Sequence, residues 1–548
     1  MASIFLVNRG DYLQARASLG PQLAETECLT NSADVYNALV AEGMPRVTFV
    51  DAVPHGAADL ARCHFEADRM ARAFDAQLSE LRTRHLGFAL PSLGWDYLNI
   101  YFIALTLLRW SRFAPQLAAA LPQRPSLAYF TVDNSQDFYF DSALQRHYLG
   151  AALRQRTSGE LRAFPVPPNR PFVAEAAQFE FDLRGDEDSA CEALVHLPTV
   201  YYDYEHHRQR LGGFHAGRLV DLSSAYFDIP IAPDRVALKL GAPARAASLA
   251  QQHYLDGVRA AAGALYQCLC PGLPPAIAAA QVERQVAKSL SQLRAFDQLC
   301  TAPKFANIRY VYLSDHDAGL SGPVATWASL RGLATEIHPH SSVAVTPFPV
   351  IPGARKHGYV REPDSFADLG NERSVWAHRL LTSASPEQAA QAARRTPQVL
   401  LLLNALTDPG GVPTCSFPAI ARFMAEAIAL CARYGVRCKV RSKASWDFSI
   451  VLASQLRAQG TPEAALAELF ATGPLEPWAE STTICIALDQ PTTALIKFLN
   501  AGAFCVQAID RPYTETELHT LPDRDVLLSD YNGAMAALQA QLTQLAAA

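Results

Sequence analysis

Residues 482–510 (TTICIALDQPTTALIKFLNAGAFCVQAID) hold side chains whose types and spacing fit the binding of a phosphate group. Thr492 and Thr493 stand just after a proline, where a helix is predicted to begin. Their hydroxyls and the unbonded N–H groups of a first helical turn can donate hydrogen bonds to phosphate oxygens. Asp489 and Gln490 form the polar turn before them, and Asp489 can orient that turn or hold a ribose. These four residues are our predicted nucleotide contacts; the alternative is that they only cap the helix.

Two basic residues supply positive charge at another strand end. Arg441 and Lys443 stand two positions apart at the end of a strand predicted over 436–440, so a continuing strand points both to one side. Cations there can neutralise the charge that develops on a departing nucleotide phosphate. We add both to the predicted donor site. The alternative is a solvated basic strand end, since such charges usually face water.

Acidic and imidazole side chains follow two further predicted strands. Asp315, His316 and Asp317 come directly after one strand, and His338 comes after the next. Such strand ends form sites in α/β proteins, and titratable groups gathered there suit proton transfer and stabilisation of a leaving phosphate. We predict Asp317 as the catalytic carboxylate, with Asp315 as its substitute. His316 would tune that carboxylate and His338 would stabilise or protonate the phosphate, whereas the alternative is that all four are caps and loop formers.

Residues near other strand ends are assigned to the acceptor side. Asp133 and Asp137 follow a strand predicted over 127–132, and one of them can face an acceptor. His340 lies two positions after His338 and joins this set.

A metal site is the less favoured interpretation of these side chains. The HPH segment seldom places both imidazoles on one ion, and no third ligand is suitably spaced. The DED and DRD segments, at 186–188 and 523–525, lie in polar loop sequences that suit solvated charges. We therefore expect no metal and no cofactor.

Alternating strands and helices must position all of these residues. Buried-strand patterns separated by helical periodicity recur over 4–166 and 399–509, which predicts parallel sheets covered by helices. A helical region is predicted between strands at 4–7 and 47–50, and further helices are predicted over 57–84, 96–120, 418–434 and 461–472. Segment 172–240 has short alternating strands, which predict a small β-rich insertion or added strands there. The 548 residues exceed what one hydrophobic core usually supports. The predicted fold is therefore α/β, with two Rossmann-like domains, 1–345 and 346–548, facing across a cleft.

Composition narrows the class of protein. Half of the residues are hydrophobic and 18% are charged, which is typical of a folded globular chain. The net charge of -6 argues against a nucleic-acid partner. Eleven cysteines without paired spacing, together with the lack of a signal-peptide pattern, favour a reducing cytoplasm. The most apolar stretch, 97–110, is shorter than a membrane span, and peripheral contact of this aromatic-rich segment with a membrane stays open.

Three segments near the C-terminus carry a resemblance to a known family. They are VLLLLNAL followed by Gly410-Gly411, CKVRSKAS at a strand end, and LDQPTTALIKFLNAG. In this order they resemble the donor-binding half of bacterial nucleotide-sugar glycosyltransferases of the GT-B fold, in particular those that build lipopolysaccharide, capsule and related surface glycans.

The resemblance implies transfer of a sugar from a nucleotide donor to a surface glycan or lipid-linked acceptor, in the cytoplasm or at the inner face of the membrane. Lys497 stands where such enzymes often have an acidic residue, and Ala444 where proline is usual. The absence of a ribose-binding glutamate favours a CMP-activated acid sugar, such as Kdo or a sialic-acid-like sugar, as the donor. Two alternatives stay open: a nucleotide-sugar epimerase on the same fold, and a non-catalytic glycan-assembly partner.

Overall fold

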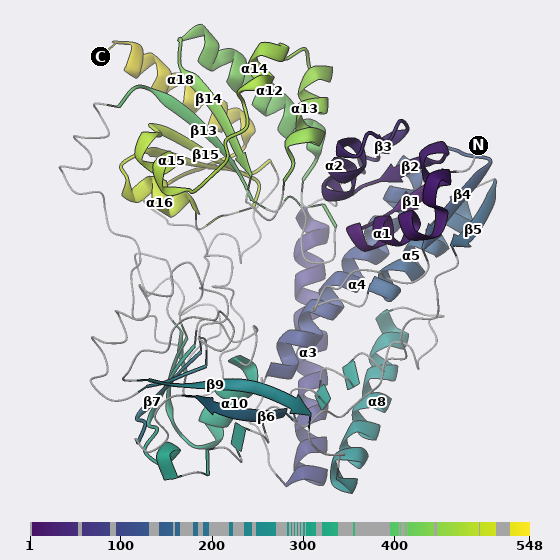
Figure 1. Ribbon diagram of the computed structural model, residues 1–548, viewed down its shortest axis with the longest axis vertical. Coiled ribbons are helices and arrows are strands. Elements are labelled where there is room, and N and C mark those ends of the chain that lie inside the picture. The colour runs from purple at the N-terminus through teal and green to yellow at the C-terminus, as the bar shows by residue number, and fades with distance from the viewer. Residues whose placement is uncertain are drawn as a thin grey trace. The chain divides into compact units, whose positions relative to one another are not determined.

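The computed structural model contains several parallel sheets with helices packed on them (Figure 1). The described residues are 3–52, 57–87, 95–130, 142–156, 159–164, 179–184, 190–196, 219–222, 235–243, 248–269, 303–313, 321–337, 354–356, 395–404, 415–442, 447–490, 494–510 and 526–547, with isolated positions between 282 and 301 and at 406, 412, 413 and 492. The predicted mixed α/β class is confirmed.

The chain divides into two compact units. Unit 1 comprises 1–64, 105–170 and 381–548, and unit 2 comprises 65–104 and 171–380. Both units are therefore discontinuous in sequence. This grouping differs from the expected division at residue 345, because the chain leaves unit 1 twice and returns to it twice.

Sheet A, in unit 1, is a five-stranded parallel sheet with the order β3-β2-β1-β4-β5. Its strands are β1 (Ser3–Leu6), β2 (Glu27–Thr30), β3 (Val47–Phe49), β4 (Ser126–Phe130) and β5 (Glu160–Phe164). Its helices are α1 (Arg9–Leu19), the 3-10 turn η1 (Gly20–Glu25), α2 (Ala33–Ala41) and α5 (Ser142–Arg156). All four residues of β1 are buried, as expected for a central strand with both faces covered.

Two long helices lie between β3 and β4 in the chain, α3 (Ala57–Leu86) and α4 (Trp95–Ala120). Both agree with the helices predicted from periodicity. None of the helices that the structure describes is long and apolar enough to cross a membrane.

Sheet B, in unit 2, has seven strands in the order β12-β11-β10-β7-β8-β9-β6. All neighbours are parallel except β6 and β9, which are antiparallel. The strands are β6 (Phe179–Arg184), β7 (Ala193–His196), β8 (Leu219–Asp221), β9 (Arg235–Pro243), β10 (Tyr310–Leu313), β11 (Ala334–Ile337) and β12 (Ala354–Lys356). The described helices include α8 (Leu249–Leu269), α10 (Ser321–Leu330) and the 3-10 turn η2 (Pro303–Phe305). Strands β6 to β9 thus pair with later strands in one seven-stranded sheet, which agrees with the expectation of added strands in this segment.

Sheet C, also in unit 1, is parallel with the order β14-β13-β15-β16-β17. Its strands are β13 (Gln398–Leu403), β14 (Arg437–Ser442), β15 (Ile484–Leu488), β16 (Phe504–Ala508) and β17 (Val526–Ser529). The helices are α12 (Phe417–Arg433), α13 (Ser449–Ala458), α14 (Glu463–Ala467), α15 (Glu476–Ser481), α16 (Ala494–Asn500) and α18 (Tyr531–Ala547). The chain builds β14 on one side of β13 and then β15 on the other, which is a doubly wound order.

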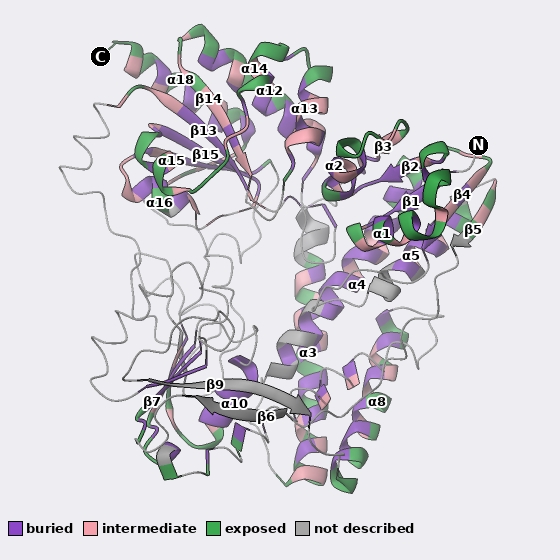
Figure 2. Cartoon of the chain, viewed as in Figure 1, coloured by how far each residue is buried: buried purple, intermediate pink, exposed green. Residues whose placement is uncertain are grey.

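Helices cover both faces of sheet C (Figures 1 and 2). On one face α12, α13 and α18 pack against alternate strand residues, including Leu401, Ile486 and Val506. The other face carries the intervening residues of the same strands, and α16 contacts β15 and β16 there. Every residue of β15 is buried, which explains why its sequence is a continuous apolar run.

Sheets A and C contact each other within unit 1. The Nδ2 of Asn37 on α2 donates to the backbone carbonyl of Asp447, with a distance of 2.5 Å between nitrogen and oxygen. The ring of Phe49, at the end of β3, packs edge-on against Phe417 of α12, with centroids 5.2 Å apart. Ala33 of α2 is buried in the same core as α12 and α13.

Several elements differ from the sequence expectation. β2 lies where only a helical region was expected, and β17 and α18 were not expected. The helix predicted over 461–472 is shorter, because α14 ends at Ala467 and Phe470 forms a parallel bridge to Val440 on edge strand β14. That bridge covers an otherwise open strand edge.

Candidate functional site

Four of the predicted donor-site residues are described, and they lie at one edge of sheet C. Arg441 is near the end of β14, whereas Asp489, Gln490 and Thr492 follow β15. Because the strands are parallel, both positions are at the carboxyl edge. Only β13 separates β14 from β15, so these strand ends are roughly 10 Å apart.

The other predicted site residues lie outside the described residues. They are Lys443 and Thr493 of the donor set; Asp315, His316, Asp317 and His338 of the catalytic set; and Asp133, Asp137 and His340 of the acceptor set. Their assignments stay predictions.

The strands that precede the predicted catalytic residues are neighbours in sheet B. β10 pairs in parallel with β11, with Leu313 beside Ile337, so the segments that follow both strands leave from one edge of the sheet. His196 ends the adjacent strand β7 in the same row. This histidine is fully buried, and burial lowers its pKa to about 3, so the imidazole is neutral at physiological pH.

The carboxyl edge of sheet C contains the topological switch point between β13 and β15. From β13 the chain continues to β14 on one side, and from β15 it continues to β16 on the other. Connections that depart in opposite directions leave a crevice, which is where open α/β sheets bind their ligands.

The turn after β15 has an unusual backbone conformation. Asp489 has a φ of 62° and is the one non-glycine residue with positive φ among the described residues. Its side chain is almost fully buried. The Asp489 N–H donates to the carbonyl of Ala508 at 2.8 Å, which extends the ladder between β15 and β16 by one residue. A left-handed conformation is unfavourable for a residue with a Cβ, so surrounding contacts must hold it.

Gln507 on β16 supplies such contacts, and sequence reasoning did not identify it. Its Nε2 donates to the carbonyls of Ala487 and Asp489, each at 3.2 Å, and the side chain is fully buried. Both neighbours are acceptors, so the amide nitrogen must face them. The available signal was a polar residue inside the otherwise apolar strand FCVQA.

Thr492 has the capping role that was the alternative to phosphate binding. Its Oγ1 accepts from the backbone N–H of Ala494 at 3.3 Å, and its carbonyl accepts from Leu495 at 3.1 Å. The helix that follows, α16, is only seven residues long. A hydroxyl that accepts one hydrogen bond can still donate its own proton.

Arg441 is partly buried and anchored. Its Nη1 donates to the carbonyl of Gly473 at 2.8 Å. Burial lowers the pKa of Arg441, and the nearby Glu476 carboxylate opposes that effect. Register places Arg441, Leu402, Ala487 and Gln507 in one row across four strands.

Lys497 forms an ion pair with Glu476, the same carboxylate that acts on Arg441. Its Nζ lies 2.6 Å from the Oε1 of Glu476, and the pair joins α16 to α15 at the surface. The lysine that stands where the family often has an acidic residue is therefore a surface contact between two helices.

Asp51 brings a carboxylate of sheet A to the start of α12. It follows β3 and accepts a hydrogen bond from the backbone N–H of Phe417, the first residue of α12. Burial raises the pKa of Asp51 to about 6. Because β3 ends and α12 begins at the carboxyl edges of their sheets, these two edges meet at this contact.

The corresponding edge of sheet A is closed by a buried ion pair. The Nη2 of Arg146 on α5 lies 2.7 Å from the Oδ2 of Asp11 on α1, and neither side chain is exposed. The same oxygen accepts from the Val7 N–H at 3.0 Å. These helices follow β1 and β4, which flank the switch point of sheet A.

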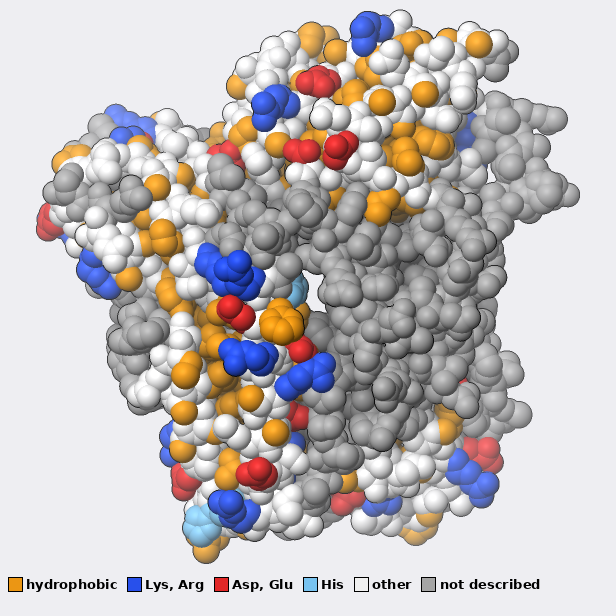
Figure 3. Space-filling view, turned by 180° about the vertical axis from the view of Figure 1, so that it is seen from behind, with side chains coloured by type: hydrophobic (Ala, Val, Ile, Leu, Met, Phe, Trp, Pro, Cys, Tyr) orange, Lys and Arg blue, Asp and Glu red, His pale blue; other side chains and the backbone are white. Residues whose placement is uncertain are grey.

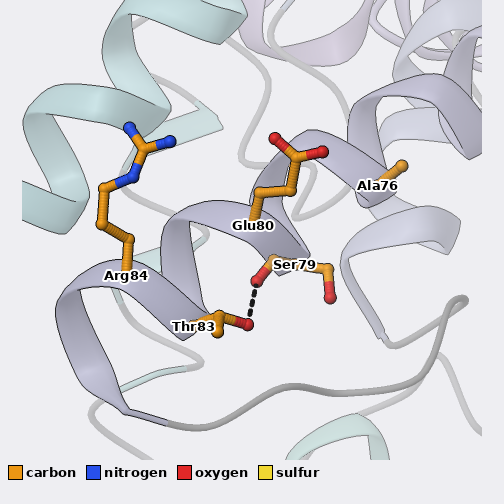
Figure 4. Close-up of a pocket in the computed structure, with 5 residues that line it drawn as sticks. All are labelled: Ala76, Ser79, Glu80, Thr83 and Arg84. Atoms are coloured by element: carbon orange, nitrogen blue, oxygen red, sulfur yellow. Dashed lines mark hydrogen bonds between the residues drawn. The ribbon is translucent and has the colours of Figure 1, made fainter.

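Among the described residues, those that line a surface hollow along α3 include none of the predicted site residues. The hollow is lined by Ala76, Ser79, Glu80, Thr83 and Arg84, all from one helix (Figure 4). The face in Figure 3 carries basic side chains beside acidic ones. Within the described ranges, no three His, Cys, Asp or Glu side chains are grouped so that they could hold a metal ion.

A scan against protein-family models finds no match for this chain, and a search of the curated proteins finds none either. Function is therefore inferred from the residues, the topology and the resemblance noted above.

Proposed function

We propose that the chain is a nucleotide-sugar glycosyltransferase whose donor binds at the carboxyl edge of sheet C. The observation that carries the proposal is the doubly wound order β14-β13-β15-β16-β17, with Arg441 and the Asp489 turn at strand ends close to its switch point. The sequence resemblance to GT-B enzymes adds the reaction class, because it falls on these same strands.

Electrostatics favours sheet C over sheet A as the nucleotide site. In sheet A the Asp11 carboxylate lies in the first turn of α1, where a ligand anion would bind, and Arg146 already neutralises it. A ligand anion would have to displace that buried pair. Sheet C instead presents Arg441, whose guanidinium keeps four further N–H donors beside the one given to Gly473.

The proposed reaction breaks the bond between the donor phosphate and the anomeric carbon of the sugar. An acceptor hydroxyl oxygen forms the new bond to that carbon and loses its proton to a carboxylate, for which Asp317 stays our prediction. The departing nucleotide takes the bonding electrons as phosphate charge. Arg441 and the Thr492 hydroxyl would stabilise that charge.

Nucleotide titration tests the donor site. We expect wild-type protein to bind CMP or UDP, with CMP favoured, and Arg441→Met to weaken binding by about tenfold or more, because charged hydrogen bonds contribute about 1.5–3 kcal/mol each. Thr492→Ala should weaken it less. Arg457→Met is the matched control, since Arg457 pairs with Glu463 on the surface of the same sheet's helices. Equal affinities of wild type and Arg441→Met would contradict the proposed site.

Product analysis tests the reaction class. With a candidate CMP-sugar or UDP-sugar, a transferase releases nucleotide faster when acceptor glycan is present. An epimerase changes the sugar without acceptor, and a non-catalytic partner binds without turnover. Activity that EDTA abolishes and a divalent ion restores would overturn the expectation of metal-independent transfer.

A further inference from the structure

We infer that Gln507 is a positioning residue of the proposed donor site, holding the Asp489 turn in the conformation that meets the nucleotide. The inference rests on the proposed function for the identity of the ligand. Its structural part rests only on Gln507, Asp489 and the strands that carry them.

The contacts of Gln507 span the two residues that define the turn. Ala487 is the fourth residue of β15 and Asp489 is the first residue beyond it, and one amide group binds both of their carbonyls at 3.2 Å. This double contact draws the two carbonyl oxygens toward one point on β16. In a straight strand the carbonyls of residues i and i+2 point to the same side but lie about 6.6 Å apart. That is too far for one nitrogen to bind both at 3.2 Å, so the chain bends after Leu488.

The bend requires the left-handed conformation of Asp489. A residue with a side chain loses stability there, and aspartate tolerates it better than most because its short polar side chain can bond locally. Without a second contact, the turn would exchange with right-handed or extended forms. Gln507 and the Asp489 N–H bond to Ala508 together select one form.

The position of this turn connects it with the proposed ligand. Gln507 shares a row with Arg441, on the face of sheet C that α16 covers. Gln490 follows Asp489 directly and Thr492 lies three positions after it, so the backbone direction at Asp489 influences where their polar groups point. Strain held by surrounding contacts is a recurring property of ligand-binding turns.

The test removes the amide group of Gln507. Gln507→Met keeps the length of the side chain and lacks the amide, and Gln507→Glu is a second variant in case the first does not fold. Thr482→Val is the matched control, because Thr482 is also fully buried but precedes β15 at the opposite edge of the sheet. Each protein is titrated with CMP and UDP, and hydrogen exchange is followed in the peptide covering 487–495.

We expect Gln507→Met to weaken nucleotide binding by about tenfold and to speed exchange in that peptide by at least as much, with Thr482→Val within twofold of wild type. In the background of Asp489→Gly, the effect of Gln507→Met should fall below threefold, since glycine adopts positive φ without support. General loss of packing would not be relieved by that glycine.

Two results separate this inference from the proposed function. If wild type binds nucleotide and Gln507→Met binds it equally well, the positioning role is overturned while the donor site stands. If wild type binds neither nucleotide, the proposed function and the ligand part of the inference both fail. In that case the exchange measurement decides the structural part: faster exchange supports it, and unchanged exchange overturns it.

Discussion

Two Asp–Arg pairs near the start of the chain differ in burial, and this decides what each contributes to stability. Asp11 and Arg146 are 2.7 Å apart with no exposed side-chain surface, whereas Asp34 and Arg9 are 3.3 Å apart with more than half of each side chain exposed. Removing one partner of a buried pair leaves an uncompensated charge and typically costs about 3–5 kcal/mol. Exposed pairs contribute about 0–1 kcal/mol.

We therefore expect Asp11→Asn to lower the free energy of unfolding by about 3 kcal/mol or more, and Asp34→Asn to change it by less than about 1 kcal/mol. Urea unfolding of both variants under the same conditions measures the difference. Similar losses for the two variants would show that the Asp11–Arg146 pair does not hold α1 to α5.

At the scale of elements, Asp51 couples the end of β3 to the start of α12 in a pH-dependent way. Burial raises its pKa from 3.8 to about 6 in the folded protein, so the folded state binds the proton more tightly than the unfolded state. The contribution of Asp51 to stability is therefore largest below the unfolded pKa and is lost as pH rises through about 6. The difference corresponds to on the order of 2–3 kcal/mol.

Asp51→Asn should remove this dependence, because the amide does not titrate and its oxygen can still accept from Phe417. Comparing the unfolding free energies of wild type and variant between pH 4 and 7 isolates the effect of this one group. The free energy of unfolding of the variant should increase relative to that of wild type as pH rises. A constant difference across that range would mean that the Asp51 pKa is not raised.

Sequence patterns correctly predicted the elements whose burial in the fold matches their own pattern of apolar residues. Continuous apolar runs identified β13 and β15, and periodicity identified α3, α4 and α12. β2 (ECLT) gave no such signal, since it is short and begins with a glutamate that binds Arg124. The turn of Asp489 was located correctly, but its left-handed backbone and the support from Gln507 arise from pairing between β15 and β16, which a local pattern does not contain.

At the scale of the whole molecule, segments that are consecutive in the sequence do not always belong to the same unit. The strands of sheets A and C are far apart in sequence yet belong to unit 1, and segments 65–104 and 171–380 form unit 2. Sequence alternation predicted Rossmann-like layers but could not show which layers share a unit, because that depends on contacts such as Asn37 with Asp447.

Each unit has its own buried core, and this predicts separable unfolding. Leu538 on α18 is fully buried in the core of sheet C, and Leu293 is almost fully buried in a core of sheet B. Leu→Ala at such positions typically costs about 2–5 kcal/mol, which lowers a domain's midpoint temperature by several degrees. We expect calorimetry to resolve more than one transition, with Leu538→Ala lowering one and Leu293→Ala lowering another. A single transition that both variants lower equally would show that the two units unfold as one cooperative body.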